Sequence, residues 1–135
     1  MSEKRLLHTA HIPVRWGDMD NYGHVNNSVY LEYAQEARID WFSIVGVDID
    51  YAKQGPVVLQ TLHTYLKPVA YPATAVLELF AGTLGRSSLV IEHRLSTLDD
   101  PHTSYGEGYC KLVWVDHPSG TSVAIPEHLR VLMTG

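Results

Sequence analysis

The 135-residue sequence has a single cysteine, few basic residues and no long apolar run. One cysteine, Cys110, excludes an internal disulfide and any zinc site built on cysteine pairs. Ten lysines and arginines against 15 acidic residues give a formal net charge of −5, which argues against binding the backbone of a nucleic acid. No apolar stretch approaches the roughly 18 residues that span a bilayer. We therefore expect neither a nucleic-acid nor a membrane partner.

A chain of this length can form one domain with a hydrophobic core, but it leaves little room for a second unit. Hydrophobic residues make up 45% of the sequence and charged residues 19%, which is ordinary for a globular protein. The N-terminal segment contains basic residues but no apolar stretch of signal-peptide length. We predict a single domain over residues 1–135, located in the cytoplasm.

Alternation of apolar side chains with a period of two predicts the strands. The expected strands cover residues 6–16, 57–66, 75–84, 89–96 and 104–115. Pro13 cannot donate to a strand ladder, so the first strand is expected at a sheet edge or at a bulge. The short Gly-Arg-Ser-Ser connection predicts a hairpin between the strands on either side of it. Pro126 is expected as the first residue of a short C-terminal helix.

A long helix is predicted between the first two strands. Over residues 27–45 the apolar side chains recur at spacings of three and four, which indicates about five helical turns. Asn26, Asn27 or Ser28 can cap its start, and Gly46 is a natural residue just past its end. One helix followed by four antiparallel strands predicts an α+β domain with the helix lying across one sheet face.

Polar side chains are concentrated immediately before this helix, where residues 16–30 contain two carboxylates, an imidazole and three amides. The start of a helix presents free N–H groups and a partial positive charge, which can hold an oxygen that becomes negatively charged. Donors near Asn27 and Ser28, together with a carboxylate that attacks or activates water, would supply half of a hydrolytic mechanism. Asp20 is placed to be that carboxylate.

The same segment and the helix after it carry a specific motif. The motif reads Asp20, His24-Val25-Asn26-Asn27, Tyr30-Leu31-Glu32 and Glu36-Ala37-Arg38, followed later by Tyr65-Leu66-Lys67-Pro68. Over nearly the whole chain this pattern resembles the 4-hydroxybenzoyl-CoA thioesterase superfamily, in particular its bacterial long-chain acyl-CoA thioesterase branch. The resemblance implies a hotdog fold with an antiparallel sheet of about five strands. It also implies hydrolysis of a fatty acyl- or aryl-CoA to free acid and CoA, without a metal or a cofactor.

The resemblance further implies homodimers, often paired into homotetramers, with active sites at the dimer interface. It places the catalytic carboxylate on Asp20 rather than on Asp18, which would shape the turn. The carbonyl-polarising N–H falls near Asn27, a position at which short-chain relatives have a histidine. His24 would orient water or Asp20, or else cap the turn by a hydrogen bond.

Substrate binding is assigned to Ser28 and Tyr30 at the helix start and to Lys67, Arg86 and Ser87 elsewhere. Lysine and arginine pair with phosphate through charge-assisted hydrogen bonds, so Lys67 and Arg86 are candidates for the phosphates of CoA. Arg86 and Ser87 lie in the predicted hairpin turn, which in this superfamily often meets the nucleotide or the pantetheine arm.

Several alternatives stay open at this point. Asp20 could act as a general base or as a nucleophile, and the domain could instead be a hotdog hydratase or dehydratase, or a non-catalytic acyl-CoA-binding module. His63 and His93 are interpreted as partly buried, hydrogen-bonded sheet residues rather than catalytic ones. The aromatic residues of the helix and the next strand, including Tyr33, Trp41 and Tyr65, are expected to pack in the core first.

Overall fold

The computed structural model describes residues 4–47, 50 and 52–135. In chain order the elements are strand β1 (Leu6–Pro13), a 3-10 turn (Trp16–Asp18), helix α1 (Asn27–Ile44), strands β2 (Gln54–Tyr65), β3 (Thr74–Leu84), β4 (Ser88–Thr97), β5 (Gly106–Asp116) and β6 (Thr121–Ser122), and helix α2 (Glu127–Thr134). The long helix and the four later strands lie where the sequence periodicity predicts them.

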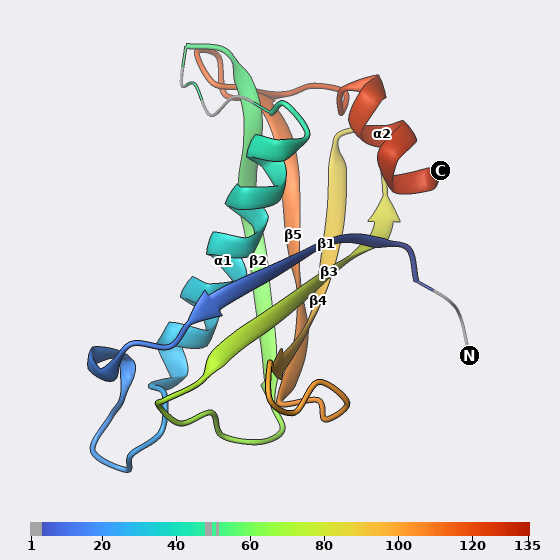
Figure 1. The fold of residues 1–135 in the computed structure, drawn as a ribbon. Helices are drawn as coiled ribbons and strands as arrows, with labels where there is room; N and C mark the ends of the chain where they lie inside the picture. The colour runs from blue at the N-terminus through green and yellow to red at the C-terminus, as the bar shows by residue number, and fades with distance from the viewer. Residues whose placement is uncertain (1–3, 48–49, 51) are drawn as a thin grey trace.

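The strands form one antiparallel sheet in the order β1-β3-β4-β5-β2, and β6 pairs with β5. The sheet therefore has six strands rather than about five, because the two-residue β6 follows the last predicted strand. Helix α1 lies across one face of the sheet and runs beside β2 (Figure 1). This is the predicted α+β arrangement, in which the start of α1 and the end of β2 lie at the same end of the molecule.

Two boundaries differ from the sequence-based expectation. Strand β1 ends at Pro13, which lies in an edge strand as expected, and residues 14–16 leave the sheet instead of extending it. They do so because the Asp18 carboxylate accepts a hydrogen bond from the Arg15 N–H and draws the chain into the 3-10 turn. Pro126 occupies the cap position before α2 rather than its first helical residue.

Helix α1 begins and ends with the residues that favour each position. Asn26 caps it by accepting a hydrogen bond from the Ser28 N–H, and Gly46 follows its end with a φ of 80°, a conformation that glycine adopts without steric cost. The sheet-facing side of the helix packs on apolar residues of β3, β4 and β5. This buried core includes Tyr33, Ala37, Trp41, Phe42, Leu77, Leu79, Leu89, Ile91, Cys110 and Leu112.

Strand β2 is an edge strand with many apolar side chains that are exposed in one chain. Val57, Val58, Leu59 and Leu62 are each at least 40% exposed, and β5 occupies only one side of the strand. An edge of this length offers free N–H and C=O groups to another strand. Among the described residues, no helix is long and apolar enough to cross a membrane.

Candidate active site

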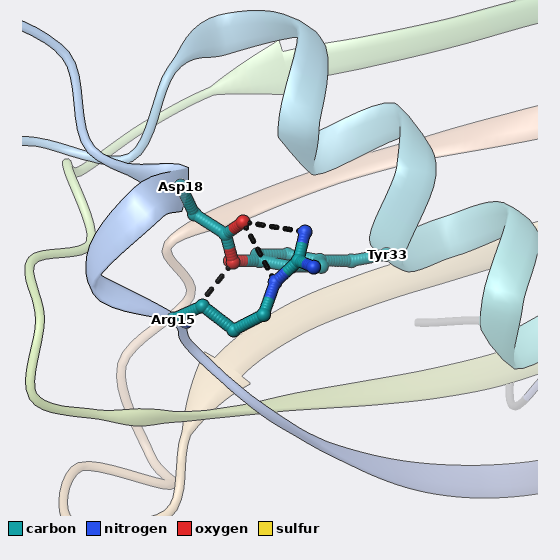
Figure 2. Close-up of polar contacts among 3 residues, drawn as sticks. All are labelled: Arg15, Asp18 and Tyr33. Atoms are coloured by element: carbon teal, nitrogen blue, oxygen red, sulfur yellow. Dashed lines mark hydrogen bonds and ion pairs between the residues drawn. The ribbon is translucent and has the colours of Figure 1, made fainter.

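The loop before α1 is held by Asp18. Its carboxylate accepts hydrogen bonds from the Arg15 backbone N–H at 3.0 Å, from the Arg15 guanidinium at 2.9 and 3.1 Å, and from the Tyr33 hydroxyl at 2.7 Å (Figure 2). Burial by itself would raise the pKa of Asp18, but these donors and the Arg15 charge hold the pKa below its usual value. Asp18 is therefore a buried, ionised anchor of the turn, which is the role that the sequence predicts for it.

Asp20 begins a tight turn, residues 20–24, which is held by two backbone hydrogen bonds. Its backbone N–H donates to the His24 carbonyl at 2.8 Å, and the Gly23 N–H donates to the Asp20 carbonyl at 3.1 Å. Gly23 has a φ of 76°, which a residue with a side chain rarely adopts. The Asp20 carboxylate accepts one hydrogen bond, from the Tyr22 N–H at 2.9 Å, and its second oxygen has no partner among the described residues.

The first turn of α1 leaves one N–H donor open. The Ser28 N–H and the Ser28 hydroxyl both donate to the Asn26 side-chain oxygen, at 3.0 and 2.9 Å, and the Val29 N–H donates to the Asn26 carbonyl. Within the described part of the chain, the Asn27 N–H has no acceptor. The sequence predicts N–H donors near Asn27 and Ser28. Only the Asn27 N–H is open, because the Ser28 N–H donates to the side chain of the cap residue Asn26.

A cavity of about 330 Å³ has both Asp20 and Asn27 in its lining. It is lined by Asp20, His24, Val25, Asn27, Tyr30, Tyr65, Leu66, Lys67 and Pro68. Asp20 also borders a second hollow of about 460 Å³, whose rim includes the exposed aromatic residues Trp16 and Tyr71. Asp20 therefore borders two hollows, one of which is also lined by the first residue of α1.

Two tyrosines form the wall of the cavity. Tyr30 is buried, and its hydroxyl accepts a hydrogen bond from the Val69 N–H at 3.0 Å; burial chiefly raises the pKa of Tyr30, and the nearby Asp20 charge adds to the rise. The Tyr65 hydroxyl donates to the Asn27 carbonyl at 2.8 Å, and the two tyrosine rings meet edge to face at 5.2 Å.

Tyr65 lines the cavity, although the sequence favours core packing for it over a place in an acyl or aryl pocket, and it is not among the site residues assigned from the sequence. The periodicity predicts it as a core residue first, but it is 49% exposed and lines the cavity. Its position directly before Leu66-Lys67-Pro68, at the end of the strand after the helix, was the signal that could have identified it. Tyr33 and Trp41, by contrast, are buried in the core as expected.

His24, in the loop before α1, and Lys67, just after the end of β2, both line this cavity. The His24 side chain is exposed and makes no hydrogen bond to the described residues, so backbone groups rather than its imidazole close the turn. The Lys67 ammonium lies 5.0 Å from the centre of the Tyr105 ring and 3.8 Å from an Asp100 carboxylate oxygen. The Lys67 side chain is 52% exposed, so its ammonium is accessible to a ligand at the mouth of the cavity.

Arg86 and Ser87 of the same chain are not among the residues that line the Asp20 cavity. They lie in the turn between β3 and β4, while the loop that contains Asp20 packs near the start of β3, where the Val14 N–H donates to the Ala73 carbonyl. The 11 residues of β3 separate the two regions by about 35 Å. The Arg86 carbonyl accepts a hydrogen bond from the Ile125 N–H, so this turn is built against the segment before α2.

His63 and His93 are hydrogen-bonded sheet residues, as predicted. Their ring nitrogens lie 2.8 Å apart, and the rings are stacked with an interplanar angle of 4°. Burial lowers the pKa of both, that of His93 to about 3, with the His63 and Arg38 charges adding to the effect for His93. No group of three or more possible metal ligands occurs among residues 4–47, 50 and 52–135.

A long helix across one antiparallel sheet is the architecture of a hotdog protein, and Asp20 and Asn27 line one cavity at the start of that helix. A family model described as the thioesterase-like superfamily matches residues 14–132, and the chain belongs to this family.

Solved structures agree with this assignment. A candidate thioesterase from Pseudomonas aeruginosa is 64% identical, with a TM-score of 0.92 over 94% of this chain and 98% of that one. A candidate acyl-CoA thioesterase from Xanthomonas campestris is 39% identical, with a TM-score of 0.74 over 83% of this chain and 95% of that one. A Staphylococcus aureus protein in complex with CoA shares the fold at 15% identity, with a TM-score of 0.85 over 99% of this chain and 85% of that one.

Proposed function

We propose that this protein hydrolyses acyl-CoA thioesters to a free acid and CoA, with Asp20 as the working carboxylate. The observation that carries the proposal is the cavity in which the Asp20 side chain and the open Asn27 N–H occur together. The similarity to a candidate thioesterase from Pseudomonas and to a candidate acyl-CoA thioesterase from Xanthomonas supports the choice of reaction.

In this mechanism the thioester carbonyl oxygen accepts a hydrogen bond from the Asn27 N–H. The positive end of α1 stabilises the negative charge that develops on this oxygen as the carbonyl carbon is attacked. Loss of one such donor typically costs on the order of 100- to 1,000-fold in rate. The rigid cap formed by Asn26 keeps this donor in place without the substrate having to order it.

Asp20 completes the reaction in one of two ways. As a general base it removes a proton from water, the resulting hydroxide adds to the carbonyl carbon, and the carbon–sulfur bond breaks to release CoA. As a nucleophile its oxygen adds to the carbonyl carbon, the carbon–sulfur bond breaks to release CoA as a thiolate that takes up a proton, and water then cleaves the acyl anhydride to the free acid and the regenerated carboxylate. Its free oxygen suits both roles, and the exposed His24 imidazole beside it can orient the water or exchange the proton with solvent.

Binding of CoA involves Lys67 at the mouth of the cavity, where its ammonium can pair with a phosphate. Arg86 and Ser87 can reach the same ligand only from a second copy of the chain, since they lie at the far end of the sheet. The exposed apolar edge of β2 supports a homodimer, in which two β2 strands pair and extend the sheet. A homotetramer would form from two such dimers.

The decisive experiment compares free-thiol release from short-chain, long-chain and aromatic acyl-CoAs by the wild type, Asp20→Asn and Asp99→Asn. Asp99 is an exposed residue of the turn after β4 and lines neither hollow beside Asp20, so its variant controls for the loss of one negative charge at this end of the molecule. We expect Asp20→Asn to lose roughly 100-fold or more in kcat/KM, with an unchanged assembly mass, and Asp99→Asn to match the wild type. Binding of acyl-CoA without turnover by the wild type would instead identify a binding module, and hydration of an enoyl-CoA would identify a hydratase.

A further inference from the structure

Arg38 is a buried arginine that has no counter-ion in the described part of the chain. It lies on α1 at 6% exposure, and its side chain makes no hydrogen bond or ion pair with the described residues. Burial lowers its pKa, but a guanidinium stays protonated at any physiological pH. A full positive charge is thus largely withdrawn from water, an unfavourable state unless an anion meets it.

The titratable groups closest to Arg38 cannot supply that anion. His93 and Cys110 of the sheet are near enough to influence its charge. His93 is neutral at pH 7 because burial lowers its pKa to about 3, and burial raises the pKa of the Cys110 thiol, which is therefore protonated. The negative charge must come from outside the described residues of one chain.

A cavity of about 200 Å³ opens onto Arg38. Its apolar lining comes from α1, β2 and β5 and consists of Ile39, Phe42, Pro56, Val58 and Leu112. The polar members are Arg38, the Gln35 amide and His117. A narrow, mostly apolar cavity that contains one arginine and one amide suits an apolar chain with a single small anionic group at its end.

This cavity and the Asp20 cavity each have lining residues on both α1 and β2, at different points along the two elements. The helix and the strand run antiparallel (Figure 1), with the Tyr65 to Asn27 hydrogen bond at one end and Val58 beside Arg38 at the other. Arg38 follows Asn27 by about three turns of α1, a rise of about 16 Å. Roughly a dozen carbon–carbon bonds of about 1.5 Å, in zigzag, cover this distance.

We propose that Arg38 binds the carboxylate at the far end of an ω-carboxyacyl group, so that the preferred substrates are CoA thioesters of long dicarboxylic acids. This inference rests on the proposed function, because the thioester carbonyl occupies the Asn27 end. The planar guanidinium matches a carboxylate through two parallel hydrogen bonds, and the Gln35 amide can donate a third. The apolar residues between the two ends would contact the methylene chain.

The first test compares kcat/KM for dodecanoyl- and tetradecanoyl-CoA with their ω-carboxy counterparts. The wild type should favour the ω-carboxy substrates by about tenfold or more, as expected for one charge-assisted bidentate contact, and Arg38→Met should abolish or reverse the preference. Arg94→Met is the matched control, because Arg94 pairs with Glu78 on strands β4 and β3, and it should keep the preference. A wild type without the preference, or an Arg38→Met variant that retains it, would overturn the proposal.

A second measurement does not depend on turnover. Calorimetric titration with free dodecanedioate and dodecanoate should show that the wild type and Asp20→Asn bind the diacid more tightly, whereas Arg38→Met does not. If hydrolysis fails in every protein but this difference persists, the Arg38 site stands while the proposed reaction does not. If Arg38→Met changes the mass of the assembly and leaves the difference between the two acids unaltered, Arg38 pairs with a second copy of the chain and the proposal is wrong.

Discussion

The Tyr65 hydroxyl donates a hydrogen bond to the backbone carbonyl of Asn27 across 2.8 Å. This contact joins the last residue of β2 to the first residue of α1, directly beside the open N–H donor. The position of the donor relative to Asp20 therefore depends on a strand that lies almost 40 residues further along the chain. Such a contact could not be inferred from the motif before the helix alone.

Removal of this contact should reduce catalysis more than stability. Tyr65→Phe loses one neutral hydrogen bond, which contributes about 0.5–1.5 kcal/mol, so we expect kcat to fall by roughly 3- to 10-fold with a smaller change in KM. Tyr109→Phe, in which the altered hydroxyl has no partner among the described residues, serves as the control. Equal kinetics of the two variants would show that the Tyr65 contact does not position the donor.

The Asp18 anchor predicts a stability effect. Tyr33→Phe removes a buried hydrogen bond to a carboxylate, so the free energy of unfolding at pH 7 should fall by about 1.5–3 kcal/mol. The pKa of Asp18 is lower in the folded state than its usual value of 3.8, so its stabilisation is present above pH 4 and is lost as the pH falls through the folded pKa. Urea unfolding at pH 7 and at pH 3 should therefore show a smaller difference between wild type and variant at pH 3.

The stacked histidines predict a second, separate pH dependence. The pKa of His93 is about 3 when folded, against an ordinary 6.5, so the unfolded chain binds more protons between these values. Stability should fall as the pH decreases below 6.5, by up to about 1.4 kcal/mol per pH unit for this residue. His93→Gln should flatten the dependence between pH 6.5 and 5, while His11→Gln, at an exposed position, should not. An unchanged slope in His93→Gln would mean that His93 is already protonated in the folded protein.

The edge of β2 predicts the effect of introduced charge on assembly. Leu59 and Leu62 are exposed in one chain, at 59% and 43%. Because like charges would face each other where two β2 strands pair, Leu59→Lys with Leu62→Lys should shift the protein to monomers in light scattering and should lower turnover. Leu98→Lys, at an exposed turn residue, is the control. A dimer that survives the double substitution would place the interface elsewhere.

The outline of the fold was accessible from the sequence because its determinants are local. The three- and four-residue spacing of apolar residues marked α1 within one residue of its observed end, and Asn26 and Gly46 marked its boundaries. Alternation marked the four longest later strands, whereas β6 was missed because two residues carry no periodicity. The first strand was predicted too long, because its end depends on a hydrogen bond between Arg15 and Asp18.

For the candidate site, too, some features follow from the local sequence and others from tertiary packing. The sequence by itself determined the family, the helix start and the segment that contains Asp20, since these depend on residues that are neighbours in the chain. The tertiary structure decided that Asn27 rather than Ser28 has the open N–H, that Tyr65 supports it, and that Arg86 lies at the opposite end of the sheet. It also decided that Arg38 is buried with no counter-ion among the residues that the structure describes. Each of these depends on which distant segments pack together, and packing is set by the whole core rather than by any local pattern.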